Sequence, residues 1–536
     1  MSSATPPKDA APEPETPAER ENSDMAALAK GGQTNFMGFL LRLAARLPFL
    51  FIGGRLYGAA ELGRFASAVI IVELVAMLCT VGEKRGLALR LSQEQQLANP
   101  RAPEAVIADG LLVCAIAGCV AALALWLVPA PMFPSGDYSR WDRLLVLAIP
   151  ALALTEIVLA AQAYRFDIAA TVRARAIVEP WTISIMTGAL WFVIPDSGMA
   201  LAYLASIYAA LLTALLPYRR TYGRAHGWRP SLSRSVRLVR RGSPLAAADA
   251  IEWGTRRLDI FILGLFAAPA AVGVYYVAQQ VASLPQKLKT SFEPILGPVL
   301  TRKLAERDYA AIARQVCQVG FWITAAQGGV ALALGIPGEA IMGIVGPGFV
   351  GGVGALGFLL AAEVVAATAV VSESALVYVA RLRNLWLSIA TIVLQGVLTV
   401  VAMVLADRYD LTSEQRAALA AGCLMLALGA ASVSKALLLS RILRQSVNNW
   451  RWPLIWAALA GAAVGQVAIR LPEWAELAFG MPLILVAYGW VIWRWGFGPE
   501  DRVLFTRKLA KDKDEDVDES DPAVVAAPAT RDGGWV

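Results

Sequence analysis

Long apolar segments recur along this chain, and they constrain its fold more than any other feature. A helix needs about 20 predominantly apolar residues to cross the hydrocarbon core of a bilayer. Fourteen segments approach this length, at 36–57, 65–82, 105–129, 144–163, 178–194, 198–217, 244–267, 271–290, 315–336, 353–379, 385–406, 417–439, 453–470 and 477–495. Hydrophobic residues make up 57% of the chain and charged residues 17%, whereas soluble proteins average about 45–50% and about 25%. We therefore expect an all-α polytopic membrane protein with about 14 transmembrane helices.

Positive charge is concentrated on alternate loops. The loops that follow even-numbered segments are rich in arginine and lysine, whereas those after odd-numbered segments are short and hold few of either. Because cytoplasmic loops of membrane proteins carry this excess, we expect the even-numbered loops and both termini to be cytoplasmic. The net charge of +6 reflects this topology, and we expect no nucleic-acid partner.

The most basic loop divides the chain into two parts of similar length, here called the N-lobe and the C-lobe. The first 30 or so residues are rich in Pro, Ala, Glu and Ser and hold no apolar run, and the last ones are rich in Lys and Asp and then in Ala and Pro. Both compositions are typical of disorder. The predicted organisation is a disordered cytoplasmic tail (1–34), the N-lobe with six spans (35–217), a basic cytoplasmic linker (218–243), the C-lobe with six spans (244–443), an extra helix pair (444–498) and a second disordered cytoplasmic tail (499–536).

The stretch 244–280 carries more charge than a lipid-facing helix tolerates. Its charged residues are Asp249, Glu252, Arg256, Arg257 and Asp259. Each charge at mid-membrane costs about 2.5–3.5 kcal/mol on the insertion scale, so such residues face each other or a hydrated cavity. Most of them recur at helical spacing and could share one face. A salt-bridge ladder between two helices would explain them, but we favour the wall of a translocation cavity.

The same stretch resembles the first apolar segment. RLPFLFIGGRLYGAAELGRFASA (46–68) aligns with RLDIFILGLFAAPAAVGVYYVA (257–278) with one gap. The aligned pairs include Arg46 with Arg257, Gly53 with Gly264 and Gly63 with Gly273. The first and seventh spans both run outward from the cytoplasm, so the repeat is parallel, about an axis along the membrane normal. We expect Arg46 and Arg257 to occupy equivalent positions near the middle of their spans.

Three motifs resemble a known family. RLYGAAELGRF (55–65), RRLDIFILGLFAAPAAVGVYYVAQQ (256–280) and FEPILGPVLTRKLAERDY (292–309) are similar to the Wzx-type polysaccharide-export flippases of the multidrug/oligosaccharidyl-lipid/polysaccharide (MOP) exporter superfamily. The resemblance implies two six-helix bundles that form a V around a central cavity, and a lipid-linked oligosaccharide as cargo. Twelve spans are usual in the polysaccharide branch, and the extra pair at 453–470 and 477–495 is also a feature of the lipid II flippase branch.

A cargo of this class joins an undecaprenyl pyrophosphate to polar sugars, so its headgroup needs a cationic, hydrated path. Arginine suits pyrophosphate because its planar fork bonds two oxygens at once and stays charged. Arg42 and Arg46 share a helix face at i, i+4. We expect Arg46 and Arg257 to face the cavity, with Arg42 and Arg256 beside them. Arg256 has an equally favoured structural interpretation, an ion pair with Glu252 one turn earlier.

Acidic residues at membrane depth have two interpretations, as carriers of a coupling proton or sodium ion or as counter-ions to the arginines. The candidates are Glu73, Glu252, Asp259 and Glu363. We favour the counter-ion role for Asp259, and ion coupling for Glu73 and Glu363, since neither has a lysine or arginine within four residues.

Two prolines interrupt the helical hydrogen-bond ladder of predicted spans. Pro48 lies in the first span and Pro285 in the eighth, and each should kink or end its helix. Such a kink could be a hinge for alternating access or a static bend.

Composition also limits the chemistry. The single histidine, His226, and five scattered cysteines without a CxxC motif predict no metal site, catalytic triad or cofactor. We therefore expect a non-enzymatic flippase that moves its cargo across the bacterial inner membrane by alternating access. Its partners would be the lipid-linked oligosaccharide, membrane lipids and a polysaccharide polymerase with its export machinery. The alternatives are a lipid II flippase, a drug or cation antiporter with an acidic cavity, and a membrane polymerase or ligase, which the short outer loops disfavour.

Overall fold

The computed structural model describes residues 47–290, 304, 308–498 and 501, and every regular element in these ranges is helical. A first group of helices covers most of the predicted N-lobe. It comprises α2 (Gly58–Cys79), α3 (Glu83–Gln95), α4 (Pro103–Leu127), α5 (Ala148–Tyr164), α6 (Ile168–Thr171), α7 (Glu179–Trp191) and α8 (Gly198–Tyr222). The expectation of an all-α fold is confirmed for the described residues.

A second group follows along the chain. It comprises α9 (Leu232–Phe266), α10 (Pro269–Thr290), α12 (Tyr309–Gly335), α13 (Gly338–Val345), α14 (Val353–Val379), α15 (Arg381–Arg408) and α16 (Ser413–Leu443). The last helices are α17 (Pro453–Ala468), α18 (Glu473–Ala475) and α19 (Met481–Val491). The bounds of α14 coincide with those of the tenth apolar segment.

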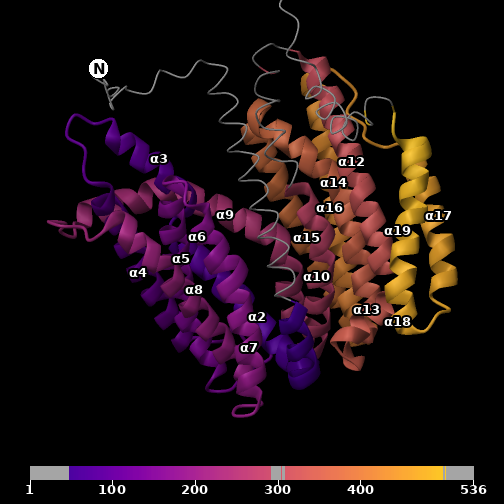
Figure 1. The fold of residues 1–536 in the computed structure, drawn as a ribbon, viewed down its shortest axis with the longest axis horizontal. Helices are drawn as coiled ribbons and strands as arrows, with labels where there is room; N and C mark the ends of the chain where they lie inside the picture. The colour runs from indigo at the N-terminus through magenta and orange to yellow at the C-terminus, as the bar shows by residue number, and fades with distance from the viewer. Residues whose placement is uncertain (1–46, 291–303, 305–307, 499–500, 502–536) are drawn as a thin grey trace, which may run out of the picture.

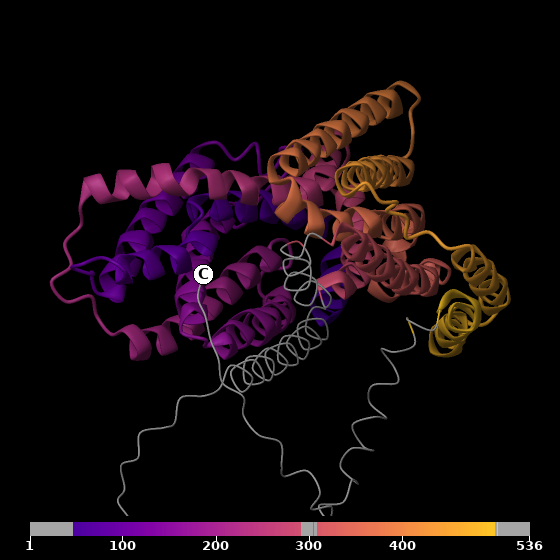
Figure 2. The same cartoon turned by 90° about the horizontal axis from the view of Figure 1, so that it is seen from above.

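The two groups stand side by side and diverge toward one end of the molecule (Figure 1). Seen from above, α2–α8 occupy one side, α14–α16 the other, and the yellow α17–α19 lie outermost (Figure 2). The outer helices pack on α12. Asp501, just beyond α19, accepts hydrogen bonds from Arg451 Nη1 at 2.7 Å and from Trp322 Nε1 of α12 at 2.9 Å, which ties this end of the outer pair to α12.

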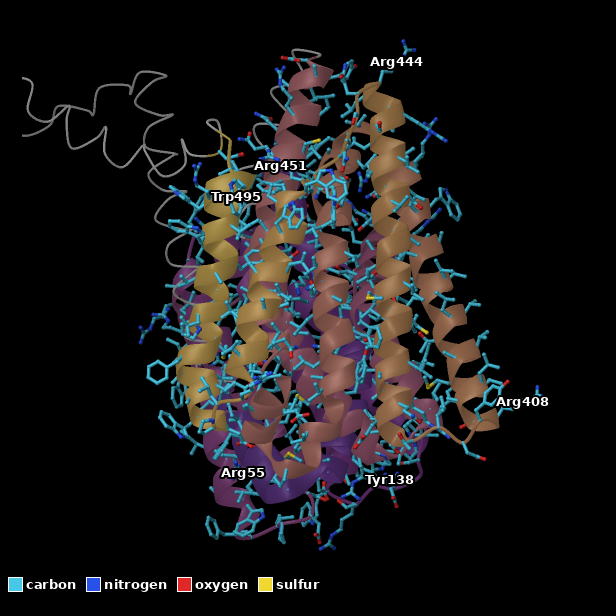
Figure 3. The ribbon with its side chains drawn as sticks, turned by 90° about the vertical axis from the view of Figure 1, so that its right-hand side faces the viewer. Arg55, Tyr138, Arg408, Arg444, Arg451 and Trp495 are labelled. Atoms are coloured by element: carbon cyan, nitrogen blue, oxygen red, sulfur yellow. The ribbon has the colours of Figure 1, made fainter. Side chains whose placement is uncertain are left out.

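The length and polarity of the helices are those of a multi-pass membrane protein. Nine helices of the described part are long and apolar enough to cross a bilayer, and α17 is an apolar helix of shorter length. Their outer faces expose large apolar side chains, such as Val120, Leu212 and Val433, which suits contact with lipid. Figure 3 shows Arg444, Arg451 and Trp495 at one end of the helices and Arg55, Tyr138 and Arg408 at the other. The total of fourteen spans stays a prediction.

The chain bends between the first apolar segment and α2. A π-helical turn at Gly53–Tyr57 precedes Gly58, whose φ of +81° lies in the region that favours glycine. Pro48 is helical, as are its described neighbours 47–52. The main break in this region is therefore at Gly58, downstream of the predicted hinge at Pro48. α10 continues through Pro285 as a helix.

α2 and α10 cross in backbone contact at two glycines. A Cβ atom at Gly63 would lie 1.7 Å from the carbonyl oxygen of Pro269, and one at Gly273 would lie 2.0 Å from that of Ala59. The contact is reciprocal, because Ala59 and Pro269 each precede their glycine by four residues. Only glycine permits so close an approach. The two glycines are the pair that the sequence alignment sets at equivalent positions.

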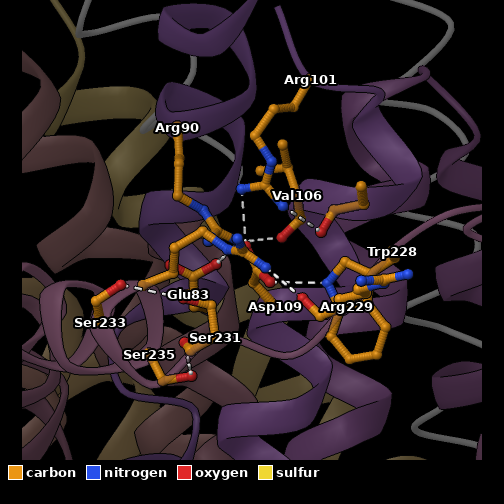
Figure 4. Close-up of polar contacts among 12 residues, drawn as sticks. Glu83, Arg90, Arg101, Val106, Asp109, Trp228, Arg229, Ser231, Ser233 and Ser235 are labelled. Atoms are coloured by element: carbon orange, nitrogen blue, oxygen red, sulfur yellow. Dashed lines mark hydrogen bonds and ion pairs between the residues drawn. The ribbon is translucent and has the colours of Figure 1, made fainter.

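α9 crosses the end of the molecule where the groups diverge (Figures 1 and 2). Its first twelve residues fall in the predicted basic linker, of which 223–231 lies between α8 and α9. Asp109 of α4 fastens this region to the N-lobe (Figure 4): it accepts hydrogen bonds from Trp228 Nε1 at 2.8 Å, Arg101 Nη1 at 2.8 Å and Arg234 Nε at 3.2 Å. Three donors hold this buried carboxylate, so the start of α9 is fixed to α4.

Candidate substrate-binding cavity

A cavity of about 1170 Å³ opens among α9, α10, α14, α15 and α16. Small-molecule sites are usually about 300–1,000 Å³, so this space admits a group larger than a drug-sized ligand. The wall mixes apolar side chains with polar ones, and its cations are Arg85, Arg256, Arg257, Arg381 and Lys435. Its carboxylates are Glu252, Glu363 and Glu373, which leaves a formal excess of two positive charges.

α9 supplies the most charged part of the wall because its charges recur at helical spacing. Arg256 Nη2 lies 3.2 Å from Glu252 Oε1, one turn away, and both side chains are about half exposed. The ion pair and the position on the cavity, which the sequence left as alternatives for Arg256, therefore occur together. Exposed pairs of this kind are weak, so an incoming anion could displace Glu252.

Arg257 differs from its neighbour in having an amide for a partner. Its Nη1 donates to Gln279 Oε1 of α10 at 2.7 Å, and within the described ranges no carboxylate lies in ion-pair distance of it. The nitrogen of the same amide group faces Asp259: Gln279 Nε2 lies 3.4 Å from Asp259 Oδ2. Gln279 thus bridges Arg257 and Asp259, and the guanidinium lines the cavity without an ion-pair partner among the described residues.

Asp259 itself lies outside the cavity wall. It is completely buried and accepts a hydrogen bond from the Tyr275 hydroxyl of α10. A buried carboxylate with these partners is a structural link between α9 and α10. Its predicted role as a counter-ion to the arginines stays a prediction.

Arg85 of α3 reaches the cavity from the N-lobe. Its Nε lies 2.7 Å from Asp249 Oδ1, and its Nη2 lies 2.5 Å from Glu252 Oε2. Asp249 is 2% exposed, so Arg85 compensates a carboxylate that could not otherwise stay charged. This contact links α3 to the first half of the cavity-lining part of α9.

The opposite wall holds a buried lysine that the sequence analysis did not select. Lys435 Nζ of α16 lies 3.0 Å from Glu373 Oε2 of α14 and 3.2 Å from Ser388 Oγ of α15. Asn384 of α15 donates to the other oxygen of Glu373 at 3.4 Å. The available signal was a lysine within the apolar segment 417–439, which is as costly in lipid as the arginines of α9.

The remaining predicted residues fall in different places. Arg42 and Arg46 lie outside the described residues. Glu363 of α14 is half-buried and lines the cavity, whereas Glu73 is half-buried on α2 and is absent from the cavity wall. Pro285 carries a carbonyl that accepts a hydrogen bond from Gln327 of α12 at 3.2 Å. The roles of all these residues stay predictions.

The chemistry of the wall suits recognition of an anion with polar substituents. Arg256 and Arg257 offer charged donors side by side, and hydroxyl and amide groups such as Ser388, Asn384 and Gln279 offer neutral ones. Among the described residues no cluster of three or more His, Cys, Asp or Glu side chains could hold a metal ion.

Comparison with known proteins identifies a family that this chain matches in sequence. The sequence pattern of a family described as "Polysaccharide biosynthesis protein" matches residues 53–324, just over half of the chain. A comparison with curated protein sequences finds no match.

The solved structures that match this fold include a lipid II flippase and transporters described as members of the MOP superfamily. A lipid II flippase, MurJ, in an inward closed conformation has a TM-score of 0.62 at 10% identity, over 90% of this chain and 100% of its own. An inward-facing multidrug resistance MATE family transporter of the MOP superfamily has a TM-score of 0.62 at 14% identity, over 76% and 96%. A MOP superfamily transporter from Pyrococcus furiosus has a TM-score of 0.54 at 13% identity, over 78% and 95%. Identities this low show the fold alone.

Proposed function

The chain belongs to the family of polysaccharide biosynthesis proteins, and from this premise we propose that it is a flippase for a lipid-linked oligosaccharide. The cargo would be an undecaprenyl-pyrophosphate-linked repeat unit, moved across the bacterial inner membrane by alternating access. The observation that carries the proposal is the large cationic cavity in which Arg257 has an amide partner in place of a carboxylate. A pyrophosphate supplies the missing anion, and the polar wall accommodates sugars.

The rest of the architecture is consistent with this proposal. The reciprocal Gly63–Gly273 contact supports a parallel two-fold repeat of two six-helix lobes, since an axis between two equivalent helices produces such symmetry. With both termini cytoplasmic, the cavity would lie toward the cytoplasmic end, where the lipid-linked unit is assembled. The extruded unit would pass to a polysaccharide polymerase and its export machinery.

Coupling would use a carboxylate at membrane depth. Glu363 is the stronger candidate because it lines the cavity, where occupancy by cargo and protonation can influence each other. Glu73 would act from α2 of the N-lobe.

Loss of the Arg257 guanidinium tests the cargo assignment. In a strain that depends on this chain, Arg257→Ala should lower surface polysaccharide about tenfold or more, because charge-assisted hydrogen bonds to the pyrophosphate are lost. Arg257→Lys should be intermediate, since it keeps the charge without the fork. Lipid-linked precursor should accumulate on the cytoplasmic face.

A matched control is Arg441→Ala, an exposed arginine outside the cavity wall. It should export normally at equal protein level. Normal export by Arg257→Ala would refute the role of this arginine in cargo binding.

A lipid II flippase is the second candidate, because the fold match to MurJ extends over 90% of this chain and includes more of it than the MATE match does. The same cavity chemistry would serve it. Rescue of a strain depleted of its lipid II flippase would favour this candidate, and failure of rescue with intact surface polysaccharide would favour the first.

Two further classes fit less well. A drug or cation antiporter needs an acidic cavity, whereas this wall has an excess of positive charge. A polysaccharide polymerase or ligase needs reactive groups in a sizeable outer loop, and the segment 128–141 between α4 and the next helical turn is short. Unchanged drug resistance and accumulation of unflipped precursor in a deletion strain would exclude both.

A further inference from the structure

The first twelve residues of α9, at 232–243, present an exposed surface with two different strips. Leu232, Val236 and Val239 are 81%, 58% and 43% exposed. At about 100° per residue these three positions fall within an arc of about 60° on the helix. The sequence analysis treated this region only as a basic linker.

A basic strip runs beside the apolar one. Arg237 and Arg240 are both exposed, and they occupy the next arc of about 60° around the helix. Neither arginine has a carboxylate partner among the described residues. The exposed face of this segment is therefore amphipathic, with an apolar strip on one side and a cationic strip beside it.

The third side of the segment is held by the protein. Leu238 is 6% exposed and packs with Val81 and Val113, and a Cβ atom at Gly242 would lie 2.0 Å from the carbonyl oxygen of Val81. Arg241 donates to Gln93 of α3. The hydrogen bonds of Arg234 and Trp228 to Asp109 fix the start of the helix (Figure 4). The orientation of both exposed strips is thus set by the fold.

The segment also lies at the right level of the molecule. α8 is one of the candidate membrane spans and ends at Tyr222, and α9 begins only ten residues later. From there α9 runs across the end of the helix group along its margin (Figures 1 and 2). A helix at this level meets the boundary between hydrocarbon and headgroups on its free side.

We propose that 232–243 is an interfacial helix that binds the anionic phospholipid headgroups of the adjacent leaflet. The apolar strip enters the outer edge of the acyl region, and Arg237 and Arg240 bind the headgroup phosphates. Charge complementarity selects anionic lipid over zwitterionic lipid. Because α9 is continuous from this segment to Arg257, lipid binding fixes the position of one wall of the cavity relative to the membrane surface.

Lipid quenching of a label on the apolar strip tests this inference in the full-length protein. Val236→Cys carries a bimane label in a background in which the two cysteines that are not buried, Cys119 and Cys317, are serine. The protein is reconstituted in phosphatidylcholine vesicles that contain the same molar fraction of phosphatidylglycerol, with bromine on either the anionic or the zwitterionic lipid. At equal fractions of brominated lipid, the anionic one should quench about twofold or more strongly.

Substitutions assign the selectivity to the basic strip. Arg237→Gln with Arg240→Gln should abolish the difference between the two brominated lipids. Arg383→Gln with Arg441→Gln, which alters two exposed arginines of α15 and α16, should leave it unchanged. Equal quenching by both lipids in the unsubstituted protein would overturn the proposal, as would selectivity that survives in the first variant. A label quenched by neither lipid would show that the strip does not enter the bilayer, which also overturns the proposal.

Discussion

The ion pair of Lys435 and Glu373 shows how one side chain keeps another charged within the cavity. The lysine side chain is 7% exposed and the glutamate side chain 42%. The two residues therefore depend on each other unequally: the glutamate can be hydrated without the lysine, whereas the lysine has only Ser388 as another described partner.

Glu373→Ala should therefore destabilise the protein by about 1–3 kcal/mol, because a buried donor loses its acceptor. Lys435→Met should cost less, and the double variant should recover most of the loss. Thermal unfolding of the detergent-solubilised protein measures all three, with Asp137→Ala in an exposed loop as the control. If the two single effects simply add in the double variant, the ion pair contributes nothing to stability.

Sequence reasoning selected the arginines on the α9 side of this cavity and missed the lysine on the opposite side. Arg256 and Arg257 were selected because they cluster with acids in an apolar stretch, and both line the cavity. Lys435 stands alone in its segment, so no local pattern marked it. Arg85 lies just after the second apolar segment, in a stretch that the sequence predicts to be a loop. Its contacts with Asp249 and Glu252 join residues more than 160 positions apart. Pairings of that range depend on the packing of helices, which periodicity does not encode.

At the scale of helices, the crossing of α2 and α10 has the strictest requirement. Gly63→Ala and Gly273→Ala each place a methyl group within 2.0 Å of a backbone carbonyl oxygen, so the helices must separate. Either substitution should destabilise the protein by about 1–3 kcal/mol or more. Thermal unfolding and the yield of monodisperse protein provide the measurement.

Gly254→Ala is the matched control for this crossing. Its Cβ atom would meet only the side chain of Ile392, at 3.5 Å, so stability should change little. Equal tolerance of alanine at all three positions would contradict the close contact of α2 and α10.

The same scale shows what periodicity and composition reveal about an element. The alignment of two apolar segments singled out Gly63 and Gly273, because glycines in apolar helices are visible in sequence. The sequence did not predict the start of α9 as a helix, because its polar residues outnumber its apolar ones and it holds no long apolar run. Its exposed strips emerge only when Leu238 and Gly242 are known to face the protein.

For the whole molecule, alternating access predicts opposite movements at the two ends. Spin labels at Gln96→Cys and Arg444→Cys report on the end where the helix groups diverge, and labels at Asp137→Cys and Arg408→Cys report on the other; all four positions are exposed. A lipid-linked oligosaccharide should shorten the first distance as it lengthens the second, because alternating access closes one end of the molecule as it opens the other. Double electron–electron resonance in nanodiscs measures both.

The control for both pairs of labels is the same measurement made without cargo. Two distances that change in the same sense, or that never change, would be incompatible with alternating access. Fold class and membrane insertion were predictable at this scale because apolar length alone determines them. The relative tilt of the two helix groups could not be predicted, since it depends on how side chains from both groups pack together.

The reciprocal glycine contact also bears on electrical insulation. A transporter for a bulky headgroup resides in a membrane that must hold its ion gradients, and a continuous file of water through it would dissipate them. Where the backbones of α2 and α10 touch at Gly63 and Gly273, no water molecule fits between the helices. The two residues whose missing side chains allow α2 and α10 to meet therefore also block a path for water along that line.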